Sequence, residues 1–84
     1  MFEELKTAKK IVGLKQLRRA VQKGLAKTVL LAEDADPWLL NEVESLCQSA
    51  GLTPIRVPSK KALGEACGIS VGAATAAILS DPNE

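Results

Sequence analysis

The chain has 84 residues, which is enough for one small domain, residues 1–84, and no second core. Hydrophobic residues make up 46% of it, and the longest uninterrupted apolar runs, such as residues 29–32, are far shorter than the roughly 20 residues of a membrane-spanning helix. The amino end lacks the basic-then-apolar order of a signal peptide. We therefore expect a cytoplasmic protein that does not associate with membranes.

Composition also argues against catalysis. The chain has no histidine, the commonest general base, and no Ser-His, Cys-His or paired-carboxylate arrangement. Its two cysteines, Cys47 and Cys67, are too few for a zinc site, which needs about four clustered ligands. We expect both to be buried, reduced thiols, with a disulfide between them as the alternative. The expectation is a non-enzyme without metal or cofactor.

The net charge of +1 conceals an uneven distribution. Residues 1–27 contain eight Lys or Arg and two Glu, a net charge of +6. Residues 28–84 contain three Lys or Arg and eight Asp or Glu, a net charge of −5. This gradient predicts a face that binds a polyanion. The alternative is a set of solvated helix surfaces that happen to come early in the chain.

The first third alternates helix, strand and helix. Residues 3–10 are expected to form a short helix, and Ile11 and Val12 a strand of two or three residues, followed by a hinge at Gly13. A second helix is expected over residues 15–23, with Gly24 as a left-handed cap. Its inward stripe follows a spacing of three and four: Leu17, Ala20, Val21 and Gly24.

The middle of the chain predicts a central strand and its following helix. Residues 28–32 are nearly all apolar, as in a strand covered on both faces. Asp36 is the expected cap and Pro37 the first residue of a helix that runs to about residue 50. Its expected buried side is Leu39, Leu40, Val43, Leu46 and Cys47.

The last third completes the sheet. Residues 53–57 contain a proline and are expected to form a strand near a sheet edge. Ser59 is the expected cap of a helix that runs to about residue 67, and Gly68 closes it. Residues 73–79 favour helix by propensity, but alternating layers need a strand there. The predicted fold is α/β: a three-layer α/β/α sandwich on a small mixed four-stranded sheet.

The clearest functional signal lies at the start of the second helix. A glycine before a helix leaves the first amides unpaired and directed outward, which favours an anion. Lys15, Gln16 and Arg19 follow within the first turns and share an outer surface. Arg and Lys can donate to guanine edges, and Gln can donate and accept. The alternative is a charged, solvated helix face beside a glycine hinge.

Three blocks of this sequence resemble the kink-turn-binding L-seven-Ae family of ribosomal proteins, especially its short bacterial members. The likeness covers nearly the whole chain, and three blocks in order are more specific than any one of them. They are Gly13-Leu14-Lys15-Gln16 with Arg19, residues 31–37 (Leu-Ala-Glu-Asp-Ala-Asp-Pro), and residues 61–74 (Lys-Ala-Leu-Gly-Glu-Ala-Cys-Gly-Ile-Ser-Val-Gly-Ala-Ala).

The resemblance implies a function and a set of contact residues. A kink-turn is an RNA bend in which tandem sheared G·A pairs accompany a three-nucleotide bulge. In the family, the glycine-led helix start meets the G·A pairs and the late loop covers the extruded nucleotide. Carried over to this chain, the helix start comprises Gly13, Leu14, Lys15, Gln16 and Arg19, and the loop contacts are Ile69, Ser70 and Val71. Candidate contacts to the RNA backbone are Lys23, Lys60 and Lys61.

This chain departs from the family pattern at several positions. Archaeal and eukaryotic members usually have Asn-Glu where this chain has Lys15-Gln16, whereas bacterial relatives share the Lys-Gln version. Leu14 replaces a small residue or threonine and so removes a hydroxyl donor, while Ser70 and Gly72 stand where Glu and Pro are frequent.

The expected partner is a structured ribosomal or regulatory RNA, bound by a monomer that associates with the ribosome. The alternative is a protein-interaction module on the same fold with a vestigial RNA site. The acidic turn of residues 33–37 is expected to be mainly structural. Trp38 is expected to pack against the domain, with a protein contact as the second interpretation.

Overall fold

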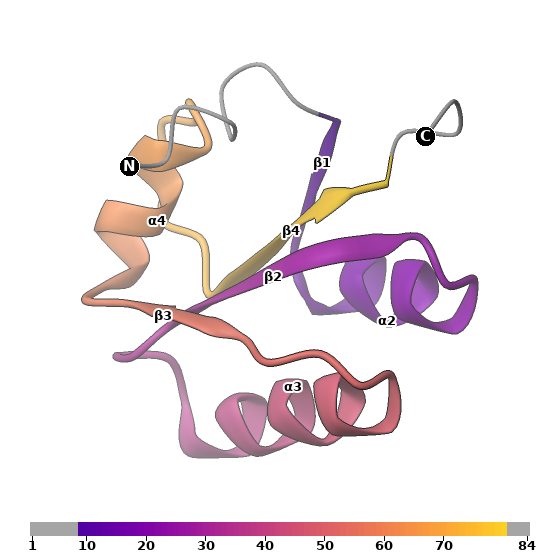
Figure 1. The fold of residues 1–84 in the computed structure, drawn as a ribbon. Helices are drawn as coiled ribbons and strands as arrows, with labels where there is room; N and C mark the ends of the chain where they lie inside the picture. The colour runs from indigo at the N-terminus through magenta and orange to yellow at the C-terminus, as the bar shows by residue number, and fades with distance from the viewer. Residues whose placement is uncertain (1–8, 81–84) are drawn as a thin grey trace.

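The computed structural model describes residues 9–80, and these form a four-stranded sheet with three helices (Figure 1). In chain order the elements are β1 (Lys10–Val12), α2 (Leu14–Gln22), β2 (Ala26–Ala32), α3 (Pro37–Ser49), β3 (Ile55–Val57), α4 (Lys60–Ala66) and β4 (Thr75–Leu79). The helix predicted for residues 3–10 falls mostly outside the described residues. At its end the prediction is wrong, because Lys10 belongs to β1 and pairs with Ile78 of β4.

The strand order is β1-β4-β2-β3, so β4 and β2 occupy the centre. β4 runs antiparallel to both of its neighbours, and β2 and β3 are parallel, which makes the sheet mixed. β3 lies at the edge, as its proline predicted, but it is two residues shorter than expected because pairing with β2 involves only three positions.

Each face of the sheet carries its own core, which confirms the three-layer prediction. Leu30 and Ala32 of β2 point into one cluster together with Leu63 of α4. The alternate residues Val29 and Leu31 point into the other cluster, which α2 and α3 cover. Figure 1 shows α2 and α3 on one side of the sheet and α4 on the other. This alternation is the period of two that side chains follow along a strand.

The last strand confirms the layer argument over helix propensity. Ala76 and Ala77 are fully buried on opposite faces of β4, where each packs against a different core. Small side chains allow helices to approach the sheet closely from both sides. In this segment tertiary packing decides the conformation, since alanine on its own prefers a helix.

The glycine predictions are confirmed as to conformation. Gly24 and Gly68 have positive φ angles, as expected for residues that end helices, and Gly51 after α3 has one as well. Gly24 is nevertheless exposed, so its predicted place on the buried stripe of α2 is wrong, whereas Leu17 and Ala20 are buried. No helix in the described part of the chain is long and apolar enough to span a bilayer.

Candidate nucleic-acid interface

The tip of α2 is built on Gly13. This residue has φ 104° and ψ 154°, a backbone conformation that residues with a Cβ rarely adopt. Its amide donates a hydrogen bond of 2.9 Å to the carbonyl of Thr75, the first residue of β4. The turn between β1 and α2 is therefore fixed to the centre of the sheet, and glycine permits it.

The first amides of α2 lack a side-chain cap. The carbonyl of Gly13 accepts from the amide of Leu17 at 3.0 Å, which begins the regular helical pattern. The amides of Leu14, Lys15 and Gln16 precede that point and have no acceptor within the helix. The first turn contains no acidic residue. The positive end of the helix dipole is thus available to an anion.

The side chains of α2 have a buried side and an exposed side, with Leu14 and Val21 half-buried between them. Lys15, Gln16 and Arg19 are exposed, as predicted from their spacing. Gln16, Arg19 and Lys23 line one shallow hollow beside the ends of β1 and β4. Leu14 is half-buried against the core under α2 and α3, so its backbone rather than its side chain is available at the tip.

A neighbouring arginine has a different environment. Arg18 extends toward α3 and forms an ion pair with Glu42. Arg19, one position along, forms no ion pair with any described residue. Local geometry therefore separates two adjacent arginines: one is neutralised by the protein and the other remains available to a ligand.

The late loop, residues 67–74, follows α4 and leads into β4. Gly68 has φ 76° and reverses the chain after the helix. Ile69 is half-buried against the core under α4, and Ser70 is exposed. Val71 has 68% of its surface exposed, the largest fraction among the exposed large hydrophobic residues of the described chain.

These two segments lie at the same end of the sheet. Val12, the residue before the α2 tip, pairs with Ala76 in β4, and the tip itself is bonded to Thr75. Val12 and Ile69 also pack against the same core cluster. Segments more than 50 residues apart in the sequence are thus neighbours, as the resemblance implied.

The acidic turn has the structural role that the sequence predicted. Asp34 accepts a hydrogen bond of 2.7 Å from the amide of Lys60 at the start of α4. Ser59 caps the same helix by accepting from the amide of Ala62 at 3.0 Å. The Asp34 contact was not predicted, because nothing local in the sequence indicates a bond across 26 positions. The side chains of Lys60 and Lys61 are exposed beside this start.

The start of α3 differs from expectation in two ways. Asp36 occupies the cap position, but its side chain accepts no hydrogen bond from the helix. Trp38 is 58% exposed, so the prediction that it packs against the domain is wrong. Arg56 of β3 is exposed and forms an ion pair with Glu44 of α3.

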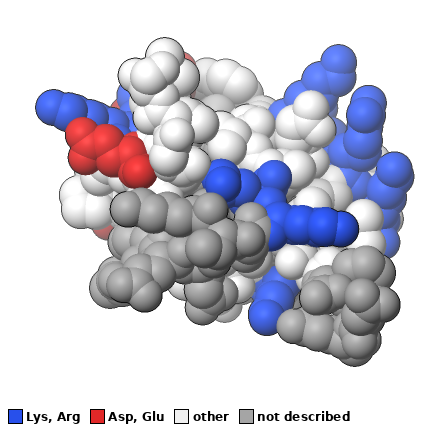
Figure 2. Space-filling view, turned by 90° about the horizontal axis from the view of Figure 1, so that it is seen from above, with Lys and Arg blue, Asp and Glu red and all other residues white. Residues whose placement is uncertain are grey.

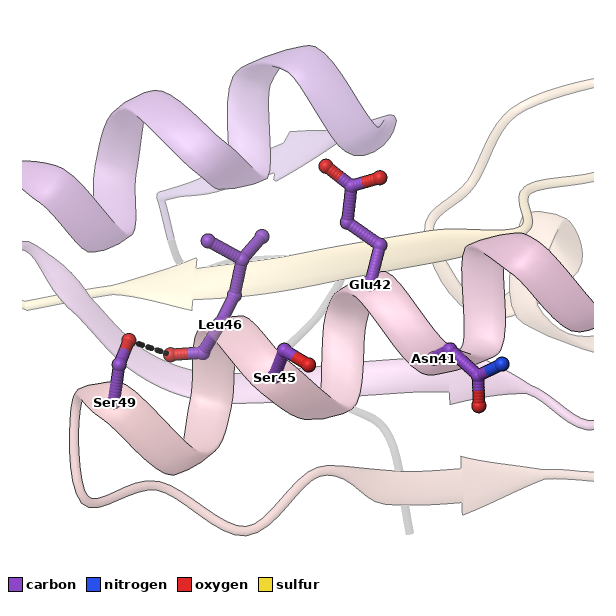
Figure 3. A pocket seen from close by; sticks show the side chains of 5 residues that line it. All are labelled: Asn41, Glu42, Ser45, Leu46 and Ser49. Atoms are coloured by element: carbon purple, nitrogen blue, oxygen red, sulfur yellow. Dashed lines mark hydrogen bonds between the residues drawn. The ribbon is translucent and has the colours of Figure 1, made fainter.

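A second hollow lies along the outer side of α3. Its lining residues are Asn41, Glu42, Ser45, Leu46 and Ser49. Figure 3 shows Glu42 and Leu46 directed toward α2, while the Ser49 hydroxyl donates to the Leu46 carbonyl at 2.8 Å. It brings together no nucleophile and base, and the described residues contain no cluster of three or more potential metal ligands.

The cysteines are free and lie on opposite faces of the sheet, Cys47 under α3 and Cys67 at the end of α4. Burial raises the pKa of both thiols above the ordinary value of 9.0. At Cys67 the nearby charge of Lys10 opposes that rise in pKa. Burial of both thiols is thus confirmed, and their positions on opposite faces of the sheet exclude the alternative of a disulfide between them.

Positive charge is spread over one face of the molecule. Figure 2 shows most of the visible Lys and Arg side chains across the centre and right of that view, while the visible acidic side chains lie at its left beside a further basic side chain. The exposed cations of the described amino-terminal segment are Lys9, Lys15, Arg18, Arg19, Lys23 and Lys27. The structure thus keeps the charge gradient of the sequence as a spatial asymmetry.

An α/β/α sandwich with a glycine-led basic helix beside the late loop is the arrangement that the sequence resemblance implied. The chain belongs to the Ribosomal protein L7Ae/L30e/S12e/Gadd45 family, whose model matches residues 2–84 and which is the family the sequence resembles. An RNA-binding protein of Geobacillus sp. (strain WCH70) is 44% identical over 75 residues, covering 89% of this chain and 92% of the relative. RNA-binding protein YbxF of Geobacillus stearothermophilus is 43% identical with the same coverage.

Solved structures are similar over almost the whole chain. The Giardia lamblia 15.5kD RNA binding protein superimposes with a TM-score of 0.84 at 28% identity, covering 98% of this chain and 72% of the other. A Bacillus halodurans protein of unknown function also gives a TM-score of 0.84 at 23% identity, covering 98% and 85%. The latter likeness concerns the fold alone.

Proposed function

We propose that this protein binds RNA without catalysing a reaction, and that its ligand is a kink-turn. One observation carries the proposal: the uncapped tip of α2 and the late loop adjoin at one end of the sheet, joined through Gly13 and Thr75. A helix tip suited to anions and base edges thereby adjoins a loop that carries an exposed apolar side chain suited to an unstacked base.

The charge of the protein and its similarity to RNA-binding proteins both support RNA as the ligand. The basic amino-terminal third supplies the electrostatic attraction that nucleic-acid binding requires. The similar proteins of Geobacillus and of Giardia lamblia are named as RNA-binding proteins. The chain covers more than 80% of the length of the Geobacillus relatives, so the likeness involves the whole domain.

Each part of the surface has a distinct role in the proposed complex. Lys15, Gln16 and Arg19 contact the edges of the sheared G·A pairs, where guanine presents the acceptors O6 and N7. The backbone at Gly13 and Leu14 allows close approach. The loop residues Ile69, Ser70 and Val71 cover the extruded nucleotide.

Sugar–phosphate contacts complete the proposed interface. In the proposed complex the exposed cations Lys23, Lys60 and Lys61 neutralise phosphates, which supplies affinity without sequence preference. We place the protein in the cytoplasm as a monomer, on ribosomal or regulatory RNA.

The test is a titration against a minimal kink-turn duplex. A second duplex of the same length carries Watson–Crick pairs in place of the tandem G·A pairs. The proposal expects tight binding to the first RNA and only weak, salt-sensitive binding to the second. Equal affinity for both would show that the protein recognises charge alone, and the kink-turn assignment would then be wrong.

Exposed Trp38 favours one second candidate, a protein-interaction module with a vestigial RNA site. The ring projects from the start of α3, near the exposed acidic residues Glu33 and Asp36, which repel phosphate. Aromatic residues are enriched at protein interfaces. Partner proteins that remain bound after RNase treatment, together with no kink-turn binding, would favour this candidate.

A further inference from the structure

The late loop is held against α4 by an unusually close approach at Gly64. The carbonyl oxygen of Val71 lies where a side chain at this position would begin: a Cβ added to Gly64 would be 2.1 Å from it. Ordinary contacts of a Cβ are 3.4 Å or longer, so any other residue would push the loop away from the helix.

Two hydrogen bonds fix the loop on either side of this contact. The amide of Ile69 donates to the carbonyl of Gly64 at 3.1 Å, and the amide of Ala73 donates to the carbonyl of Lys60 at 3.0 Å. Gly72 also lies against Lys60, because a Cβ there would be 3.3 Å from the Lys60 Cβ. The loop therefore lies flat along one side of α4 and is attached at both ends.

The backbone of Gly64 does not itself require glycine. The residue lies inside α4 and is not among the described glycines with a positive φ. Glycine in a helix interior is less stable than alanine. The close approach of the Val71 carbonyl explains why glycine fits here, and that approach leaves the Val71 side chain exposed on the opposite side of its backbone.

We propose that Gly64 is a positioning residue for RNA recognition. Because it has no side chain, the loop can lie close to α4, and this position allows Val71 to contact the nucleotide extruded from the bend. The inference rests on the proposed function. Gly64 is buried and does not touch the ligand, so its effect on RNA is transmitted through the Val71 backbone.

The experiment compares two kink-turn RNAs that differ only at the extruded nucleotide, which is intact in one and abasic in the other. The wild-type protein should prefer the intact RNA. Gly64→Ala should lose this preference. Its affinity for the intact RNA should fall by roughly fivefold or more, the effect of one misplaced interface contact. Both proteins should still discriminate against RNA whose G·A pairs are replaced, because the α2 tip is unchanged.

Gly24→Ala is the matched control for stability. Gly24 has φ +70° and open space around it, so alanine there introduces backbone strain at the far end of α2 without moving the loop. This variant should lose stability in urea denaturation yet keep the wild-type preference for the intact nucleotide. A similar loss of preference in Gly24→Ala would mean that destabilisation alone causes the effect, and would overturn the inference.

Val71→Ala keeps the test decisive if Gly64→Ala does not fold. It should abolish the preference by itself, and in a folded double variant it should add nothing to the effect of Gly64→Ala. Wild-type preference retained by either single variant would overturn the positioning role. Failure of the wild-type protein to bind any kink-turn RNA would instead refute the proposed function.

Discussion

The starts of α2 and α4 differ in how their first amides are satisfied. The start of α4 is closed by two side chains: Ser59 accepts from the amide of Ala62 at 3.0 Å, and Asp34 accepts from that of Lys60 at 2.7 Å. The start of α2 follows a glycine, with no side-chain cap and no acid in its first turn.

This contrast separates a structural helix end from one suited to a ligand. Orphan amides at a helix start need acceptors, which the protein, water or a ligand supplies. At α4 the protein supplies them and gains stability. At α2 they remain available beside exposed Lys15, Gln16 and Arg19, where an RNA ligand can supply acceptors. The contrast predicts that changes to the exposed side chains at the α2 tip affect binding, whereas removing the Ser59 cap of α4 affects stability.

The largest effect is expected from Arg19→Ala. Losing a guanine contact should weaken kink-turn binding by about 1–3 kcal/mol, because a bidentate arginine contributes on that scale. Gel-shift titration measures the change. Arg18→Ala is the matched control, since Arg18 is paired with Glu42, and it should weaken binding much less. An unchanged affinity in Arg19→Ala would remove this residue from the site.

Next in size is the effect of Ser59→Ala. Removing the cap of α4 should lower the free energy of unfolding by about 1 kcal/mol, measured by urea denaturation. RNA affinity should stay close to wild type. Ser49→Ala serves as a control, because the exposed Ser49 hydroxyl bonds to a carbonyl near the end of α3. The contrast between the helix starts fails if Ser59→Ala chiefly reduces affinity.

A smaller effect is expected from Lys61→Ala. Loss of one phosphate contact should lower the salt dependence of RNA binding by about one counterion while leaving the preference for G·A pairs intact. Titrations at several salt concentrations give this slope. Arg56→Ala is the comparison, because Arg56, on the edge strand β3, is paired with Glu44 of α3. Equal slopes for wild type and Lys61→Ala would place Lys61 outside the interface.

The smallest effect is expected from Trp38→Ala. Its exposed ring makes little contact with the core, and acidic neighbours keep phosphate away, so stability and RNA affinity should each change by less than about 0.5 kcal/mol. The same denaturation and gel-shift measurements apply. A loss of affinity comparable to that of Arg19→Ala would show that the start of α3 also contacts RNA.

Much of the fold could be predicted because local and global signals agree. The nearly continuous apolar run of β2 and the glycines after the helices each indicate their structure within a few residues. β4 shows the limit of local signals, since Ala76 and Ala77 favour helix, and only the need for a fourth strand predicted the correct conformation. The same conflict made the prediction for Lys10 wrong: this residue favours helix by propensity but joins a strand because β4 offers it a partner.

The candidate site divides in the same way. The tip of α2 follows from a glycine and the helical spacing of Lys15, Gln16 and Arg19, which the sequence displays directly. The bond from Lys60 to Asp34 and the packing of Val71 on Gly64 arise only when separate segments meet in three dimensions. The exposure of Trp38 could not be predicted either, because it depends on how the start of α3 is oriented relative to the core.

Thr75 has a consequence for the shape of any bound molecule. Its buried hydroxyl donates to the carbonyl of Leu30 at 2.8 Å, and its own carbonyl holds Gly13 at 2.9 Å. The adjacent Ala74 carbonyl accepts from Ala32 at 2.9 Å. The helix tip and the last residue of the loop are therefore both hydrogen-bonded to the central strands, while the rest of the loop is attached to α4. In the proposed complex, an RNA strand that touches both places would have to bend to follow this surface.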